Sequence, residues 1–328
     1  MCKYVLGIDI SKSFFDIALL DVDASYVTGR FNNSQHGFRS LRKWLQNREV
    51  KTLHACMEAT GRYGDALAAF LVDEGYDVSM VNPARICAYG QSKLTRTKTD
   101  KADAILIADF CATQSPPLWT KPSVFRSELQ SLTRYLDDLK NARKQELTRR
   151  KSGVPSAAVR RAIQEHIDFL SQQIDQVEKE IKDLIDSDEE NRIQFELLTS
   201  IPGIGFVTAA TFLAEVPDIS DFPQARQLAS YAGLCPKHHQ SGSSVRKKAR
   251  LSKTGNPYLR KTFYMPAIAM LRGHNPLIQP LIERMQEDRR KPMIIVGAIM
   301  RKLLHLAYGV LKTGKPFDPF YLSGSISA

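Results

Sequence analysis

Residues 4–20 read YVLGIDISKSFFDIALL, two apolar runs separated by a short polar turn. Residues 4–10 are apolar apart from Asp9, and a short run rich in Val, Ile and Tyr predicts a strand. Residues 14–20 predict its hairpin partner, and a weaker strand pattern follows at 26–31. The chain is therefore expected to begin with an antiparallel meander.

Helical and strand patterns alternate after the meander, which predicts an α/β domain. The expected elements are, in order, a helix at 37–47, a strand at 53–57, a helix through 67–71 and a strand at 76–81. The breaker cluster Gln-Ser-Pro-Pro at 114–117 predicts a linker. We therefore expect the first domain to occupy residues 1–120.

A heptad seam follows the linker. Apolar residues recur with alternating spacings of 4 and 3 at Ile163, Ile167, Leu170, Ile174, Val177, Ile181 and Leu184. A shorter arm has the same kind of spacing at Leu129, Leu132, Leu136 and Leu139. With Gly153 between them, the two arms predict an antiparallel coiled-coil hairpin over 121–192. A narrow seam leaves a lone hairpin marginal, so we expect a second copy from another subunit, with packing inside one chain as the alternative.

The third segment, residues 193–328, is expected to be mainly helical. Its Ile-Pro-Gly-Ile-Gly sequence at 201–205 precedes an apolar helical pattern, which is typical of a helix-hairpin-helix-like turn. Such a turn exposes backbone N–H groups at the start of the next helix, where phosphates bind. Gly203 and Gly205 are therefore candidate nucleic-acid-binding positions, although a tight turn between core helices explains the same sequence.

Residues 222–282 contain no Asp and no Glu but ten Lys and Arg. The whole chain has a net charge of +11, so this window supplies nearly all of the excess. A field of one sign is costly unless a polyanion neutralises it, and interleaved hydroxyls and cations suit phosphate contacts. A merely solvated basic face is the alternative. The candidate nucleic-acid contacts in the window are Lys237, Arg246, Lys247, Lys248, Arg250, Lys253, Arg260 and Lys261.

The composition places the chain among globular proteins, because 43% of its 328 residues are hydrophobic and 25% are charged. Five scattered cysteines without a CxxC pair indicate thiols in a reducing cytosol, not a disulfide frame or a zinc site. The N-terminus reaches an Asp too early for a signal peptide. The longest apolar run, 293–300, ends at Arg301, far short of the roughly 20 residues that a membrane span needs. We therefore expect a cytoplasmic protein with no membrane partner.

Four carboxylates are candidate catalytic residues of the first domain. Asp9 and Glu58 each lie at the polar end of an apolar strand, where the sites of α/β folds are found. Asp100 and Asp103 are spaced i, i+3 and share one face of an expected helix. Together the four suit two hard divalent cations with oxygen ligands, as in two-metal phosphodiester chemistry. Taken singly, Asp9 also fits a turn former and Asp100 fits a helix N-cap.

These motifs resemble those of a family of DEDD insertion-sequence transposases that is similar to the Piv DNA invertases. The matching segments are GIDISK at 7–12, MEATG at 57–61, KTDKADA at 98–104, IPGIG at 201–205, YAGL at 231–234, QSG at 240–242, KTGN at 253–256 and LR at 259–260. Members of this family join a RuvC-like domain of ribonuclease-H fold to a C-terminal transposase domain through a coiled coil. The resemblance therefore implies three domains, at 1–120, 121–192 and 193–328.

The resemblance also implies a recombinase that excises and inserts its own element. A structured noncoding RNA, the bridge RNA, would direct it by pairing with donor and target DNA. The metal ligands, for Mg²⁺ or Mn²⁺, would map to Asp9, Glu58, Asp100 and Asp103, and the nucleophilic serine to Ser241. A homo-oligomer is implied as well, a dimer or a dimer of dimers on DNA, in the bacterial cytoplasm beside the nucleoid.

Ser241 separates two interpretations of the chemistry. A serine hydroxyl is a weak nucleophile until a metal, a base or nearby cations favour its alkoxide. As a recombinase, the protein would use Ser241 to hold one DNA end covalently, and Gly242 would permit close approach. As a RuvC-type hydrolytic nuclease, it would use water, and Ser241 would only contact the DNA backbone. The residues alone leave Ser243 and Ser244 open as nucleophiles, and a non-catalytic scaffold would need no carboxylates.

Overall fold

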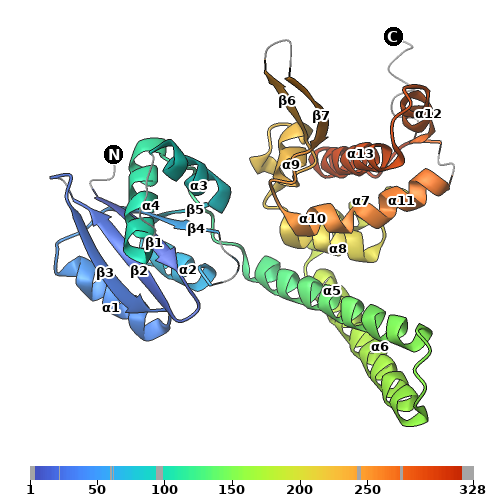
Figure 1. Ribbon diagram of the computed structural model, residues 1–328, viewed down its shortest axis with the longest axis horizontal. Coiled ribbons are helices and arrows are strands. Elements are labelled where there is room, and N and C mark those ends of the chain that lie inside the picture. The colour runs from blue at the N-terminus through green and yellow to red at the C-terminus, as the bar shows by residue number, and fades with distance from the viewer. Residues whose placement is uncertain are drawn as a thin grey trace. The chain divides into compact units, whose positions relative to one another are not determined.

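The computed structural model describes the chain in two compact units, Met1–Lys121 and Pro122–Ala328 (Figure 1). The described residues are 4–21, 23–59, 61, 63–93, 99–241, 245–273 and 276–319. Within 238–249, the description of the two strands covers the backbone and not the side chains. We treat each unit by itself. The further division of the second unit at residue 192 stays a prediction.

The N-terminal unit contains a five-stranded sheet of order β3-β2-β1-β4-β5. Its strands are β1 (Tyr4–Ile10), β2 (Phe14–Leu20), β3 (Tyr26–Asn32), β4 (Leu53–Glu58) and β5 (Asp77–Val81). The first three strands pair antiparallel, while β4 pairs parallel with β1 and β5 parallel with β4. The meander and the two later strands expected from the sequence are confirmed, with ends that differ by one residue at most.

Helices cover both faces of this sheet. They are α1 (Gln35–Gln46), α2 (Asp65–Asp73), α3 (Pro83–Ser92) and α4 (Asp100–Gln114). On one face, alternate residues of β1 and β2 such as Leu6, Ile8 and Phe15 join α1 and α2 in a buried core. On the other face, α4 contacts β1, β2 and β4. The result is the mixed α/β architecture expected for a ribonuclease-H-like nuclease domain.

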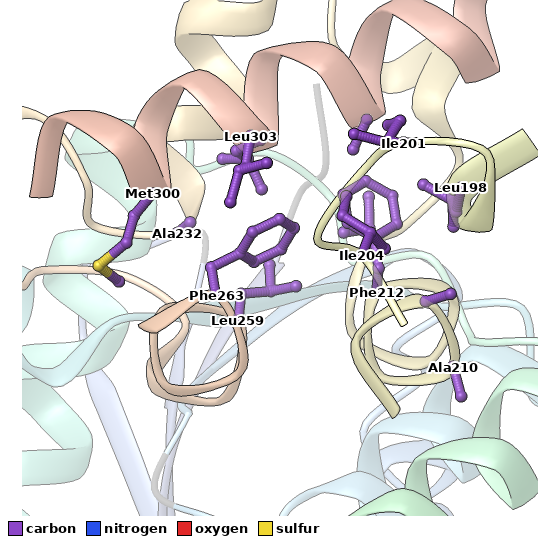
Figure 2. Close-up of a cluster of buried hydrophobic side chains, with 14 of the residues drawn as sticks. Leu198, Ile201, Ile204, Ala210, Phe212, Ala232, Leu259, Phe263, Met300 and Leu303 are labelled. Atoms are coloured by element: carbon purple, nitrogen blue, oxygen red, sulfur yellow. The ribbon is translucent and has the colours of Figure 1, made fainter. Parts of the chain in front are cut away.

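The C-terminal unit is mostly helical. Its elements are α5 (Val124–Lys151), α6 (Ala157–Asp186), α7 (Glu189–Thr199), α8 (Phe206–Glu215), the 3₁₀ turn η1 (Ile219–Asp221), α9 (Ala225–Tyr231), β6 (Pro236–Ser241), β7 (Val245–Leu251), α10 (Pro257–Thr262), α11 (Tyr264–Arg272), α12 (Gln279–Glu287) and α13 (Pro292–Thr313). Side chains of α8, α10 and α13 fill one core (Figure 2), where the rings of Phe212 and Phe263 meet edge-on at 6.2 Å. Burial of such aromatic and aliphatic groups is the main stabilising term of this unit.

The helical hairpin expected from the heptad pattern is formed by α5 and α6, with Gly153 at φ +80° in its connection. Its seam departs from the expected register at one end, because Ile185 is 1% exposed and Leu184 is only partly buried. In α5, Thr133 is buried where Leu132 was expected to be. The seam residues of α6 from Ile163 to Ile181 are buried within this single chain, so the seam itself leaves no apolar stripe for a second copy, whereas Val159 and Phe169 of the same helix are exposed.

The strands β6 and β7 differ from the expectation of a mainly helical third segment. They form a two-stranded antiparallel sheet that projects from the helices of the unit (Figure 1). Their sequences, PKHHQS and VRKKARL, contain few apolar residues. Because these sequences have no apolar alternation, the pattern gave no signal for strands. Leu251 anchors the ribbon, because its Cδ1 lies 3.1 Å from where a Cβ of Gly297 would be.

The longest apolar run also needs correction. The run of apolar residues ends at Arg301, but the helix that contains it, α13, comprises 22 residues from Pro292 to Thr313 and is long and apolar enough to cross a membrane. Half of its most apolar window is buried inside the unit, including Ile295, Ile299 and Leu303. Core packing therefore explains the composition of this helix. The four cysteines among the described residues are free, with Cys56 and Cys111 buried, as expected for reduced thiols.

Candidate active site

The ends of two neighbouring parallel strands bring Asp9 and Glu58 together. The β1–β4 register pairs Ile8 with Met57, so Asp9 and Glu58 are the next residues on adjacent strands. Because side chains alternate along a strand, Asp9 shares the sheet face of Gly7. Both carboxylates are half-buried. The sequence thus places two of the four predicted ligands at one edge of the sheet.

Helix α4 approaches the sheet closely at Gly7. A Cβ there would lie 2.1 Å from the carbonyl oxygen of Ala104 and 2.3 Å from the nitrogen of Ala108, so only glycine fits. Asp103 immediately precedes Ala104, and Gly7 is two residues before Asp9 on the same face. The contact of Gly7 with the backbone of Ala104 and Ala108 therefore brings the first turn of α4 to the end of β1 where Asp9 lies.

The helix start resolves the alternative interpretation of Asp100. Thr99 is the N-cap, and its hydroxyl accepts a hydrogen bond from the nitrogen of Ala102 at 3.2 Å. Asp100 is therefore the first residue of α4 and not its cap. Asp100 and Asp103 both lie in the first turn, where the helix dipole favours negative charge.

Electrostatics indicate that three of the four carboxylates act on one another. Burial raises the pKa of Asp9 from 3.8 to about 6, and the negative charges of Asp103 and Asp100 act in the same direction. Asp16 adds to this effect. A carboxyl group whose pKa is raised by burial and by neighbouring carboxylates is typical of functional sites.

Asp16 and Arg30 belong to this site and were missed by the sequence analysis. Asp16 lies opposite Asp9 in the β1–β2 register and is 1% exposed. Arg30 on β3 donates through Nε to both carboxylate oxygens of Asp16 at 3.0 Å, and its Nη2 lies 2.8 Å from an oxygen of Asp100. The guanidinium also stacks over the ring of Phe14 at 4.2 Å. An acid inside the apolar strand FFDIALL was a signal for Asp16, whereas finding Arg30 requires the strand register.

The donor atoms of the four predicted ligands suit a divalent metal, but the arrangement of their side chains in this structure suits it less well. Within the described parts of the chain, no group of three or more His, Cys, Asp or Glu side chains is arranged to hold a metal ion. One oxygen of Asp100 contacts Arg30 instead. All the donors are carboxylate oxygens, which Mg²⁺ and Mn²⁺ prefer, and Asp9 lacks the bidentate cation that neutralises Asp16. The residues fit a hard cation once Asp100 turns away from Arg30.

The predicted nucleophile lies in the C-terminal unit. Ser241 is the last residue of β6, and its backbone pairs with Val245 on β7. Its side chain lies outside the described residues, as do those of Arg246, Lys247 and Lys248 and the whole of residues 242–244. At the other end of the ribbon, Lys237 is opposite Arg250. The structure therefore places the backbone of Ser241 at the end of β6.

The turn at 201–205 joins α7 to α8, as expected. Ile201 and Ile204 are buried, whereas Gly203 and Gly205 are exposed. Gly203 has φ +92°, a conformation that favours glycine, and Gly205 precedes the first residue of α8. The turn thus packs into the core through its isoleucines. Phosphate binding at its glycines stays a prediction.

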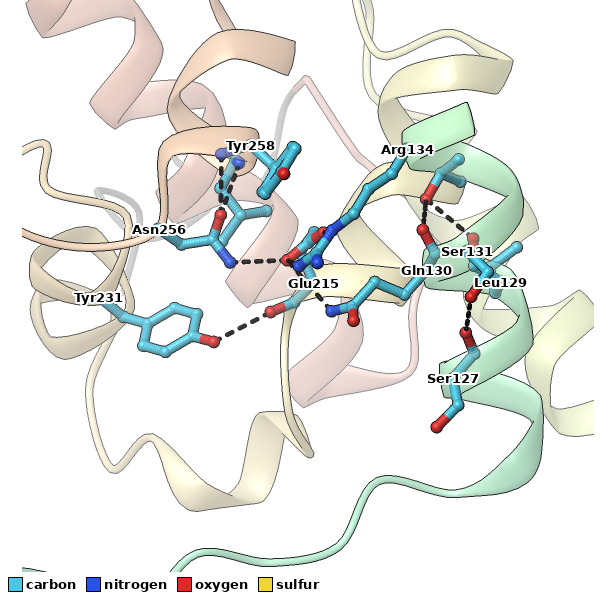
Figure 3. Close-up of polar contacts among 11 residues, drawn as sticks. Ser127, Leu129, Gln130, Ser131, Arg134, Glu215, Tyr231, Asn256 and Tyr258 are labelled. Carbon is cyan, nitrogen blue, oxygen red and sulfur yellow. Dashed lines mark hydrogen bonds and ion pairs between the residues drawn. The ribbon is translucent and has the colours of Figure 1, made fainter. Parts of the chain in front are cut away.

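A buried carboxylate organises the base of the ribbon (Figure 3). Glu215 is 3% exposed, and Arg134 donates to its two oxygens at 2.7 and 3.0 Å. Asn256 donates to Glu215 at 2.8 Å and also caps α10, while the Tyr231 hydroxyl donates to the carbonyl oxygen of Glu215. Gln130 adds a contact from α5. The motifs around Tyr231 and Asn256 are therefore joined through one buried acid, which sequence analysis could not identify as their partner.

Some predicted nucleic-acid contacts are engaged inside the unit. Arg260 donates to the carbonyl oxygen of Ala232 at 3.1 Å, and burial lowers its pKa. Lys261 forms an ion pair with Asp137 at 2.6 Å. Lys253 is exposed on the loop that follows β7. The cations of the acid-free window are thus not equivalent, since part of them stabilise the fold.

A ribonuclease-H-like sheet with carboxylates at its central strand ends and on the helix above them defines a DEDD-type enzyme that acts on DNA. The chain belongs to the IS116/IS110/IS902 family of transposases. It matches the DEDD transposase domain of IS110 type over residues 6–154 and the model of the IS116/IS110/IS902 family over 195–283.

Two kinds of relative are similar to the chain. It is 38% identical over 320 residues to the pilin gene-inverting protein of Moraxella bovis, covering 97% of this chain and 98% of that protein. It is 25% identical over 301 residues to the transposase for insertion sequence element IS1111A of Coxiella burnetii, covering 82% of this chain and 78% of that one.

Proposed function

We propose that this chain is an RNA-guided DNA recombinase that cleaves and exchanges strands to move its insertion sequence. Membership of a transposase family supports an enzyme acting on DNA. The name of the Moraxella relatives supports strand exchange that can invert as well as insert a segment. The observation that carries the proposal is the close approach of α4 to β1 at Gly7, which brings the first turn of α4 to the end of the strand where Asp9 lies, so that Asp100 and Asp103 act on the pKa of Asp9.

The tetrad is proposed to hold Mg²⁺ or Mn²⁺ through Asp9, Glu58, Asp100 and Asp103. A bound divalent cation would polarise the scissile phosphate and stabilise the charge that develops there. The protein's own contribution is orientation: adjacent parallel strands fix Asp9 and Glu58, and the capped first turn of α4 fixes the other two. Asp16 holds the guanidinium of Arg30, and this cation lies beside Asp100.

Ser241 is proposed as the nucleophile. Its Oγ would form a bond to phosphorus as the bond from phosphorus to a sugar oxygen breaks, and the proton lost by Oγ would balance the one gained by the departing hydroxyl. A hydroxyl of the exchanged strand would reverse this step and release Ser241. The phosphodiester energy would stay in the protein–DNA bond, so no ATP is needed. The cationic sequence around Ser241 favours its ionised form.

The partners follow from the same proposal. Donor and target DNA would be read by pairing with a bridge RNA encoded by the element, since base pairing can carry the specificity that side chains lack. The acid-free window would bind phosphates through Lys237, Arg250 and Lys253 and the cations between them. The active form is proposed to be a homodimer or a dimer of dimers on DNA, in the bacterial cytoplasm.

A metal-dependent hydrolytic nuclease is the second candidate. It is favoured by one observation, that the N-terminal unit carries all four carboxylates by itself. Hydrolysis would need only these residues and water. In that case Ser241 would contribute no more than a contact to the DNA backbone.

The tetrad is tested by alanine variants of Asp9, Glu58, Asp100 and Asp103. Each should abolish cleavage in Mg²⁺ while DNA binding changes little, because phosphate affinity comes from the basic window. Asp73→Ala, which removes an exposed acid of the same unit, should cleave like the wild type. Recombination at the wild-type rate in any tetrad variant would remove that residue from the site.

A further inference from the structure

A cleft of about 700 Å³ lies within the C-terminal unit, and its lining residues include neither the four carboxylates nor Ser241. Helices α5, α8, α10, α11 and α13 and the end of β7 contribute its walls. Its size is typical of sites that take a small molecule or one or two units of a polymer. The proposed chemistry uses none of the side chains that line it, apart from the cations of the basic window.

The cleft exposes large apolar side chains. Tyr258 and Tyr264 are each 37% exposed, Met293 is 60% exposed and Met265 is 65% exposed, and all four line the cleft. Clustered exposure of this kind marks an interaction site. Tyr258 is held in place, because the guanidinium of Arg134 stacks on its ring at 4.2 Å and Glu215 fixes that guanidinium. The ring is therefore a preorganised surface.

The charges lining the cleft are strongly one-sided. Six cations and two acids contribute, and both acids are already paired, Glu215 with Arg134 and Asp137 with Lys261. The cations are Arg134, Lys140, Lys144, Lys253, Arg260 and Lys261. Six minus two leaves four positive charges beside exposed aromatic rings, and one of these, Lys140, is paired with Glu178 outside the cleft. This combination suits a ligand that is both anionic and flat, and it disfavours an ordinary apolar protein segment.

We propose that this cleft binds unpaired bases of a DNA strand, with Tyr264 and Tyr258 stacking on bases and Lys144 and Lys253 contacting the phosphates. Stacking on aromatic rings beside a cationic track is the usual mode of single-strand binding. The inference rests on the proposed strand exchange, because exchange leaves bases unpaired between cleavage and rejoining. DNA is the chosen occupant because the family acts on DNA.

The test uses the full-length protein and a short fluorescent single-stranded DNA, with binding followed by anisotropy. Tyr264→Ala should weaken binding about 5- to 150-fold, the range for losing one stacked base. Tyr264→Phe keeps the ring and should bind as the wild type does. Tyr135→Ala, which removes a ring of α5 that is 49% exposed and lies outside the cleft, should also leave binding unchanged.

The phosphate contacts have their own test. Lys144→Ala and Lys253→Ala should each reduce the slope of log affinity against log salt concentration by about 0.7, the value for one phosphate of a single strand. Lys179→Ala on the exposed surface of α6 is the matched control and should leave the slope as it is.

Three results would overturn the inference. The first is binding of single-stranded DNA by Tyr264→Ala as tight as that of the wild type. The second is tighter binding of RNA of the same sequence through the same side chains. The third is a lower oligomer mass in Tyr264→Ala, which would make the cleft a contact between copies of the chain. Cleavage of duplex DNA by the wild type distinguishes failure of the cleft assignment from failure of the recombinase proposal. If duplex cleavage persists while the cleft variants bind normally, only the cleft assignment fails, and if cleavage is absent while the cleft variants lose binding, only the recombinase proposal fails.

Discussion

The ionised carboxylate of Asp9 lowers the stability of the metal-free protein. Its folded-state pKa, about 6, lies above the ordinary 3.8, so the folded state disfavours the ionised carboxylate. The resulting loss of stability is complete above the folded pKa, shrinks as the pH falls through 6, and vanishes below 3.8, where both states are protonated. Because the side chain is only partly buried, screening by water reduces the size of this effect but not its sign.

Asp9→Asn should therefore stabilise the protein in chelator at about pH 8, and the gain should disappear towards about pH 4. Urea unfolding at the two pH values measures it, with Glu49→Gln, an exposed acid of the same unit, as the control. Added Mg²⁺ should stabilise the wild type and not Asp9→Asn. A variant that is less stable than the wild type at the higher pH would contradict the account.

Arg30 and Asp16 should set the metal affinity. Arg30→Gln alone leaves the buried Asp16 without its cation, which should lower the free energy of unfolding. Asp16→Asn with Arg30→Gln restores stability and keeps the local charge, since five acids with one cation and four acids with none both give −4.

The double variant frees Asp100 from an exposed ion pair worth up to about 1 kcal/mol, so it should bind Mn²⁺ about two- to fivefold more tightly. Paramagnetic titration with Mn²⁺ measures this without turnover. Weaker binding by the double variant would instead make Arg30 a group that positions Asp100 for the metal.

The sequence predicted the tetrad but not its neighbours. Asp9 and Glu58 end apolar strands, and Asp100 and Asp103 repeat at a helical interval, so local patterns suffice for them. Arg30 reaches Asp100 only through the register of three strands. Such partners depend on tertiary contacts that the local pattern does not encode.

Helix α4 is the element that the site depends on most. Gly7→Ala would place a Cβ 2.1 Å from the Ala104 carbonyl oxygen, so α4 must move away and carry Asp100 and Asp103 with it. We expect a loss of about 1–3 kcal/mol of stability, as for other overpacked cores, together with loss of Mg²⁺-dependent cleavage. Gly29→Ala is the matched control, because a Cβ there meets only side chains at 3.3 Å or more. Normal cleavage by Gly7→Ala would refute this role of α4.

The hairpin of α5 and α6 gives a second prediction about elements. Leu170→Asp with Ile174→Asp places charges in a seam that is buried within one chain, so far-ultraviolet circular dichroism should show lost helix. Phe169→Ser, at a side chain 55% exposed on α6, should keep the helix content. If the hairpin also mates with another chain, Phe169→Ser should lower the mass in light scattering, and an unchanged mass would argue against mating through this face of α6.

At the scale of the whole molecule, the order of segments was predictable and the ribbon was not. Changes in apolar period marked the α/β unit and the long helices, because burial imposes those periods. The ribbon of β6 and β7 is rich in charged residues and has few apolar ones, so its sequence shows no such period. The excess of Lys and Arg in residues 222–282 nevertheless predicted that this region contacts nucleic acid, since charge can be counted without knowledge of the fold.

Trapping of a covalent protein–DNA adduct tests the central claim most directly. End-labelled duplex carrying the element's ends is incubated with the full-length protein, Mg²⁺ and RNA transcribed from the element, and the products are resolved on a denaturing protein gel. The account predicts a labelled band at the mass of the protein that Ser241→Ala abolishes, together with recombinant product, while Ser243→Ala and Ser244→Ala retain both. Nicked product with no such band, and a Ser241→Ala variant slowed only about ten- to a few hundred-fold, as for one lost charge-assisted contact of about 1.5–3 kcal/mol, would contradict it and establish hydrolysis.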